Sequence, residues 1–186
     1  TLPVTLTATD ILAIHDDIIY VHYNQPFPRK QIDAYDLDGN FIETFLRTDK
    51  GHGTHYQYTT GITAHDGEIY VLLGRHGTAV YPLEVQVLTP DGTLQRQFGS
   101  KGSGNGQFLQ PNGIVIHNNQ IFIPDTERKD IQVFDLNGNY QRKFTLQAPG
   151  ISGNLYPDYI KIAGNELFAI TKVEQYGNPT VRVYDL

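Results

Sequence analysis

The chain has 186 residues and is 39 % hydrophobic, 11 % aromatic and 18 % charged, values that indicate a globular, β-rich protein and exclude a disordered one. Its net charge of −6 disfavours a surface that is basic all round, as general nucleic-acid binding requires. Without cysteine the chain has no disulfide, thiolate metal ligand or thiol nucleophile, and no run of about 18 apolar residues could span a membrane.

We expect a soluble chain whose compartment stays open, with secreted and periplasmic locations both allowed. Because the sequence contains no methionine, we expect it to have been processed or excised. Its first residues, Thr1 to Thr5, lack the charged segment and apolar core of an export signal, so we expect any such signal to have been removed.

Four similar segments follow one another along the chain, and internal repeats of this kind indicate the architecture of a fold. We place the repeats at about 7–46, 57–99, 110–145 and 156–186. Each contains an apolar strand with an aromatic anchor, and the anchors are Tyr20, Tyr70, Phe122 and Phe168. The anchors are about 46 to 52 residues apart, which is the length of a propeller blade.

The first three repeats contain the same elements in the same order: a short apolar strand, a polar turn, the anchor strand, a loop, a third strand of alternating polarity, a second turn and a fourth strand. The second turns are Asp38-Gly39, Asp91-Gly92 and Asn137-Gly138, dipeptides that supply the positive φ of a hairpin. Four short antiparallel strands per repeat predict propeller blades.

The fourth repeat offers only three strands, and the third of them is at 180–184. Leu2 and Leu6 have the same spacing as Phe41 and Phe45 in the fourth strand of the first repeat. We therefore predict a single all-β propeller domain, 1–186, of four four-stranded antiparallel blades, with the last blade completed by an N-terminal strand at 1–6. The alternative is a fragment of a larger propeller, for example one of six blades.

The third repeat carries a glycine-rich segment and three further motifs: Phe98-Gly-Ser-Lys-Gly-Ser-Gly-Asn-Gly-Gln-Phe108, Pro111-Asn-Gly-Ile114, Ile121-Phe-Ile-Pro-Asp125-Thr126 and Ile131-Gln-Val-Phe-Asp135. This repeat resembles the NHL repeat, and the other three are similar to weaker copies of it. The resemblance implies a propeller, most often of six blades, that serves as a protein-interaction scaffold, an extracellular sensor or an RNA-binding domain. Related six-bladed propellers are calcium-dependent lactonases or a zinc-dependent lyase.

In such a blade the connecting loops lie on one face, and the tight turns lie on the other. The loops carry most of the lysines and arginines, whereas aspartates concentrate in the turns, where they suit the turn geometry. Tyrosine and histidine are also abundant in the loops, and such side chains suit recognition. Our candidates for ligand binding are His22, Tyr23, His52, His55, Tyr56, Tyr58, His76, Tyr81, Tyr156 and Tyr159.

Two further sets of residues are candidates for chemistry. His52 and His55 could bind a metal through neutral imidazoles, although their spacing is not diagnostic. Four polar residues each lie two positions before the first apolar strand of a repeat, where they would line the mouth of a central channel or cap the strand: Asp10, Thr60, Asn112 and Asp158.

These patterns predict a ligand- or protein-binding scaffold that uses its loops to hold a protein, peptide or glycan. One alternative is a metal-dependent hydrolase or lyase with its site at the central channel, and another is an RNA-binding NHL domain, which the sparse lysines and arginines disfavour. We identify no catalytic residue and predict no cofactor. A metal site, if the propeller has one, would take calcium or zinc. A closed ring predicts a monomer, and an open one predicts a dimer or part of a larger propeller.

Overall fold

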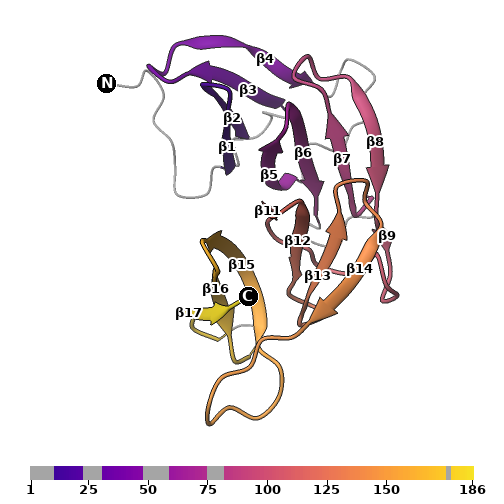
Figure 1. Cartoon of the computed structure of the whole chain (residues 1–186), viewed down its shortest axis with the longest axis vertical. Coiled ribbons are helices and arrows are strands. Elements are labelled where there is room, and N and C mark those ends of the chain that lie inside the picture. Colours follow the sequence, from indigo (N-terminus) through magenta and orange to yellow (C-terminus); the bar gives the residue numbers. More distant parts are fainter. Residues whose placement is uncertain (1–10, 23–30, 48–58, 75–81, 175–176) are drawn as a thin grey trace. The chain divides into compact units, whose positions relative to one another are not determined.

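A computed structural model describes residues 11–22, 31–47, 59–74, 82–174 and 177–186. In these residues all regular structure is β-strand, and seventeen strands form consecutive antiparallel sheets and one short parallel pair. The chain divides into two compact units, Thr1–Gln97 and Phe98–Leu186, which we call unit 1 and unit 2. Each unit contains two propeller blades (Figure 1).

Unit 1 contains blades 1 and 2, both with strands paired in chain order (Figure 1). Blade 1 consists of β1 (Ile11–His15), β2 (Ile18–His22), β3 (Gln31–Asp36) and β4 (Phe41–Arg47). Blade 2 consists of β5 (Thr59–His65), β6 (Glu68–Leu73), β7 (Glu84–Leu88) and β8 (Leu94–Phe98), whose last residue is the first of unit 2.

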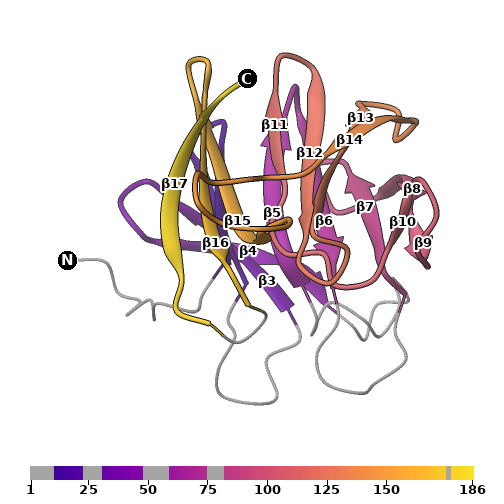
Figure 2. The ribbon, with the colours of Figure 1, turned by 90° about the horizontal axis from the view of Figure 1, so that it is seen from below.

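Unit 2 begins with a short parallel pair, β9 (Ser100–Lys101) and β10 (Gln107–Phe108), in the glycine-rich loop. Blade 3 consists of β11 (Val115–His117), β12 (Gln120–Asp125), β13 (Asp130–Asp135) and β14 (Tyr140–Phe144). Blade 4 contains three strands, β15 (Tyr156–Ala163), β16 (Glu166–Lys172) and β17 (Thr180–Asp185), with β17 at the outer edge (Figure 2).

The prediction of an all-β propeller with four antiparallel blades is therefore confirmed. The N-terminal strand that we expected to complete blade 4 lies outside the described residues.

The turns have the backbone geometry that their residues favour. Between β1 and β2, Asp16 and Asp17 have φ of 48° and 63°, and between β11 and β12, Asn118 and Asn119 have 47° and 58°. Such left-handed pairs form hairpin turns whose twist matches the flanking strands, and aspartate and asparagine tolerate this conformation better than other non-glycine residues.

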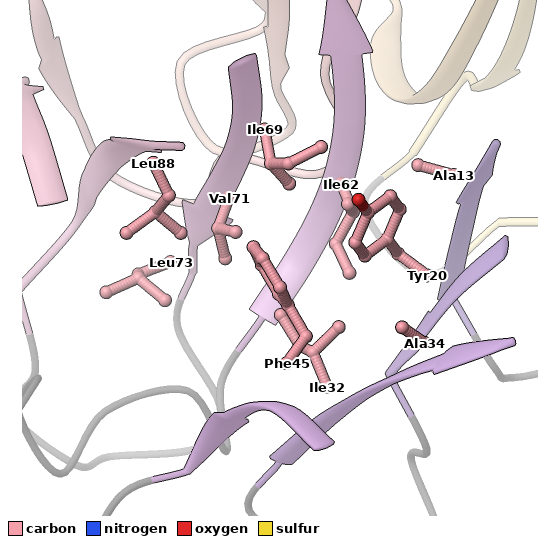
Figure 3. Close-up of a cluster of buried hydrophobic side chains, with 10 residues drawn as sticks. All are labelled: Ala13, Tyr20, Ile32, Ala34, Phe45, Ile62, Ile69, Val71, Leu73 and Leu88. Carbon is pink, nitrogen blue, oxygen red and sulfur yellow. The ribbon is translucent and has the colours of Figure 1, made fainter. Parts of the chain in front are cut away.

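The core of each unit lies between its two blades. In unit 1, Tyr20, Ile32 and Ala34 of blade 1 pack with Ile62 and Ile69 of blade 2 (Figure 3). Burial stabilises each large apolar side chain by about 1.5–3 kcal/mol, which explains why the strands of a blade are apolar on both faces.

Unit 2 has the same arrangement. There Phe122 and Val133 of blade 3 pack with Ile160, Leu167 and Ala169 of blade 4. The aromatic anchors Tyr20 and Phe122 thus occupy equivalent interfaces in the two units.

Candidate ligand-binding site

A β-bulge shapes the loop end of the first strand in blades 2 and 4. Pairing of β15 with β16 passes from Pro157–Thr171 to Tyr159–Ile170, so Asp158 is an extra residue. Pairing of β5 with β6 passes from Thr59–Leu73 to Gly61–Leu72, so Thr60 is the extra residue in the same phase of its repeat. Bulges are common next to functional sites, where they redirect a side chain.

Blade 3 has a comparable irregularity around Asn112. The bridge between Pro111 and Asp125 and the pair Val115–Phe122 enclose one more residue on the first strand than on β12. The backbone N–H of Asn112 donates to the carbonyl of Pro124 at 3.0 Å, which fixes Asn112 at the loop end of the blade.

The polar side chains at these positions in blades 3 and 4 are in contact. The amide Nδ2 of Asn112 donates to Oδ1 of Asp158 at 2.8 Å, and the ammonium of Lys172 lies 2.7 Å from Oδ2 of Asp158. The side chains of Lys172 and Asp158 are 23 % and 19 % exposed, so a ligand can reach groups that are already held in place.

Tyr159 adds an aromatic surface to this group. It is 46 % exposed, and its ring lies against Gly113. Partial burial, and secondly the charge of Asp158, raise the pKa of Tyr159 above its ordinary 10.0, so the phenol is neutral at physiological pH.

Tyr156 extends the surface along blade 4. It pairs across the strands with Lys172, and the ammonium of Lys129 lies 4.3 Å from the centre of its ring. Such a cation–π contact contributes about 0.5–1 kcal/mol at an exposed site. We call the six residues of this surface the loop-end cluster: Asn112, Lys129, Tyr156, Asp158, Tyr159 and Lys172.

Buried polar contacts hold the loops beneath this cluster. Asp125 is fully buried and accepts hydrogen bonds from the backbone N–H groups of Leu109, Gln110 and Arg128 at 2.8, 3.0 and 3.1 Å. Burial raises the pKa of Asp125 despite these bonds. The hydroxyl of Thr126 donates to the carbonyl of Pro157 at 2.8 Å and so ties blade 3 to blade 4 next to Asp158.

Of the other predicted site residues, only His22 and Thr60 are described, and both belong to unit 1. His22 was predicted to lie in a loop, but it is the last residue of β2, is paired with Ile32 and is only 1 % exposed. This prediction was wrong, and His22 belongs to the interior of blade 1. Thr60 lies in blade 2, in unit 1. Eight predicted residues lie outside the described part of the chain: Asp10, Tyr23, His52, His55, Tyr56, Tyr58, His76 and Tyr81.

Sequence reasoning placed Tyr156 and Tyr159 in a loop, but both lie in β15. It placed Asn112 and Asp158 just before the first apolar strand of a repeat, and it did not include Lys129 or Lys172 among the candidate site residues. Their positions follow from the register of β15 with β16 and from the loop between β12 and β13, whose Lys129 has a φ of 59°. The only available signal for Lys172 was its place at the end of the anchor strand, in the same repeat as Asp158.

The described residues do not provide a metal centre. Among them, no three His, Cys, Asp or Glu side chains come together, and one oxygen of Asp158 is already paired with an ammonium group. The metal candidates His52 and His55 are not among these residues. The described part of the chain also contains no helix long and apolar enough to cross a membrane.

The antiparallel blades define a β-propeller, and the loop-end cluster of blades 3 and 4 is its candidate binding surface. Residues 54–152 match a family described as a 6-bladed beta-propeller. Because this match covers more than half of the chain, the chain belongs to that family. No curated protein matches it.

Solved structures with the same fold include natural and designed propellers. The computationally designed Ika4 protein is 16 % identical, with a TM-score of 0.56 over 100 % of this chain and 96 % of its own. A chain of the nidogen/laminin complex is 18 % identical, with a TM-score of 0.65 over 94 % of this chain and 58 % of its own. BamB from Moraxella catarrhalis is 11 % identical, with a TM-score of 0.53 over 94 % of this chain and 42 % of its own. The sequence thus spans about half the length of these two natural propellers, and identities this low show the fold alone.

Proposed function

We propose that this propeller is an NHL-type binding module that holds a peptide segment of a protein partner at the loop-end cluster. One observation carries the proposal: the exposed ring of Tyr159 lies beside the Asn112–Asp158–Lys172 group, whose members are bonded to one another and partly open to solvent. Aromatic side chains on a rigid scaffold bury contact area at low entropic cost, and fixed polar groups beside them supply specificity.

The NHL assignment is supported by what the motif residues do in blade 3. Asp125 and Thr126, which carry much of the resemblance, fix the loops under the cluster. The glycine-rich segment is held in the same way, because Gln132 accepts from the N–H of Gly106 at 2.9 Å and donates to the carbonyl of Gln107 at 2.7 Å. A motif that stiffens the loops suits a binding surface, because a preorganised surface loses less entropy when it binds.

Peptide binding can be tested with a phage-displayed library of linear peptides panned against the chain. We expect enriched peptides to bind the wild type and to lose about tenfold or more in affinity in a Tyr159→Ala/Lys172→Ala variant, because removal of central aromatic and charged contacts costs about 1–3 kcal/mol. Calorimetry on one synthetic peptide measures this loss.

The matched control is Lys161→Ala, which removes an exposed lysine from blade 4 outside the cluster and should leave the affinity unchanged. If no peptide is enriched, or if an enriched peptide binds the double variant as tightly as the wild type, the proposal is wrong.

The described residues lend no specific support to the metal-dependent or RNA-binding alternatives. Unit 2 contains eight basic and eight acidic residues, and unit 1 contains six basic and twelve acidic ones. Neither balance supplies the excess of positive charge that drives RNA binding.

A further inference from the structure

The charges of the loop-end cluster are not balanced. The cluster contains two ammonium groups, those of Lys129 and Lys172, and one carboxylate, that of Asp158. Both oxygens of this carboxylate have a partner, because Oδ1 accepts from Asn112 at 2.8 Å and Oδ2 lies 2.7 Å from the ammonium of Lys172. The cluster therefore carries an excess of positive charge, and its one carboxylate is already engaged inside the cluster.

The basic residues of blade 3 differ in how their charges are used. The side chain of Arg128 is only 4 % exposed, and its guanidinium donates to both oxygens of Asp130 at 3.1 Å. Lys143 lies 3.6 Å from the same carboxylate. The ammonium of Lys129 instead lies 4.3 Å from the centre of the Tyr156 ring, and no carboxylate of the described residues comes within ion-pair distance of it. Contact with a ring face leaves N–H donors of this ammonium for an anion.

The backbone holds Lys129 in a conformation that lysine does not favour. Its φ is 59°, and among the described residues it is the one residue with a positive φ that is neither glycine, aspartate nor asparagine. Its backbone N–H donates to the carbonyl of Asp125 at 2.9 Å, which fixes the turn between β12 and β13 in this shape. Strained backbone of this kind is concentrated at active sites and ligand clamps, so the conformation independently marks Lys129 as a binding residue.

We propose, on the basis of the peptide-binding function proposed above, that the bound peptide presents an acidic side chain whose carboxylate lies beside Tyr156 and meets both Lys129 and Lys172. Tyr156 brings the two lysines to one place, because Lys129 lies over its ring and Lys172 is paired with it across the strands. Lys172 also keeps N–H donors beyond the one directed at Asp158. Hydrogen bonds between ions are stronger than those between neutral groups, so these lysines favour a carboxylate over an amide.

The sequences of peptides enriched by panning provide the first test. Among binders that lose affinity in the Tyr159→Ala/Lys172→Ala variant, we expect Asp and Glu to be about twofold or more above their frequency in the starting library. Cluster-dependent binders without this enrichment would overturn the acidic ligand and leave peptide binding standing. Enrichment of Lys or Arg would have the same consequence, because it would show that the cluster holds a cation. Recovery of no binder would overturn both proposals.

A double-mutant cycle on one enriched peptide provides the second test. The peptide is synthesised with an amidated C-terminus and carries either Glu or Gln at the acidic position, and calorimetry measures its binding to the wild type and to Lys129→Gln. We expect Lys129→Gln to weaken binding of the Glu peptide by about fivefold or more and to change binding of the Gln peptide by less than about twofold. Equal losses for the two peptides would show that Lys129 does not meet the carboxylate and would overturn the proposal.

The matched control is Lys143→Gln, which removes a 45 % exposed lysine of the same blade that lies outside the cluster. It changes the net charge by the same amount as Lys129→Gln, and we expect it to change binding of the Glu peptide by less than about twofold. Equal losses in the two variants would mean that net charge alone attracts the peptide, which would overturn the proposal. Binding that requires a free C-terminus would also overturn it, because the terminal carboxylate would then be the group recognised.

Discussion

Units 1 and 2 share one architecture but differ in charge and in their polar chemistry. Both pack an apolar core between two blades, yet unit 1 carries twice as many acidic as basic residues, whereas unit 2 is balanced. At the same bulged position, blade 2 has Thr60 and blade 4 has Asp158. The comparison shows that both units keep the same strand pattern, while the side chains at equivalent positions differ in charge.

The largest expected effect concerns the buried carboxylate of Asp125 in blade 3. Asp125→Ala leaves three backbone N–H groups without their acceptor, and we expect the free energy of unfolding to fall by about 3 kcal/mol or more. Urea denaturation measures this loss. In this variant, hydrogen exchange should become faster in blade 3 than in blade 1. An equal increase in both units would contradict the role of Asp125 in holding blade 3.

In unit 1 a comparable charged contact joins β6 to β8. Arg96 donates to Glu68 at 2.6 Å and to the hydroxyl of Tyr70 at 3.1 Å, and the bond from Arg96 lowers the pKa of Glu68 below its ordinary 4.5. We expect Arg96→Ala to cost about 1–2 kcal/mol at pH 7, because both partners lose a donor in a partly buried place.

This cost has a defined pH dependence. A carboxyl with a lowered pKa stabilises the fold fully above its unfolded pKa, and that stabilisation is lost as the pH falls through the lower folded value. The difference between the wild type and Arg96→Ala, measured by urea unfolding at several pH values, should therefore shrink below about pH 4.5. A difference independent of pH would show that Glu68 is not involved.

Substitutions in the loop-end cluster should affect the free energy of unfolding less than they affect peptide affinity. Asp158→Ala removes one ion pair and one hydrogen bond in a partly exposed place, and we expect the free energy of unfolding to change by only about 1 kcal/mol. Affinity for a selected peptide should nevertheless fall, because Asn112 and Lys172 lose the group that orients them. Thr60→Ala, at the equivalent position of unit 1, should leave that affinity unchanged, and an equal loss in both variants would place the site elsewhere.

The smallest effect is expected at two turns that are alike in both units. Asp36 bonds Asn40, and Asp135 bonds Asn139, through both the backbone and the side-chain N–H groups of each asparagine. The side-chain bonds lower the pKa of both aspartates, so their stabilisation is present at neutral pH and is lost below about pH 3.8. In Asp36→Asn and in Asp135→Asn, the free energy of unfolding should therefore fall less steeply with decreasing pH than in the wild type. Unequal changes in the two variants would reveal a difference between the units.

The repeats were readable from the sequence because they depend on local patterns. Alternation in 131–135 and the Asx-Gly turns predicted the blades. Asn112 and Asp158 share one phase of the repeat, but the sequence did not predict the hydrogen bond between them. Lys172 was not predicted, because its approach to Asp158 depends on the bulge in β15. His22 was assigned to a loop because the alternation of its strand does not show that β2 pairs with β3 as far as Ile32.

The bulge at the loop end affects how such a protein can acquire a new ligand by substitution. A bulge residue lies outside the cross-strand register, so its substitution leaves the paired residues on either side of it in place. Threonine and aspartate occupy this position in blades 2 and 4 without disturbing either sheet. A duplicated repeat with one such position per copy can therefore acquire a new ligand by point mutation, with little risk to the fold that presents it.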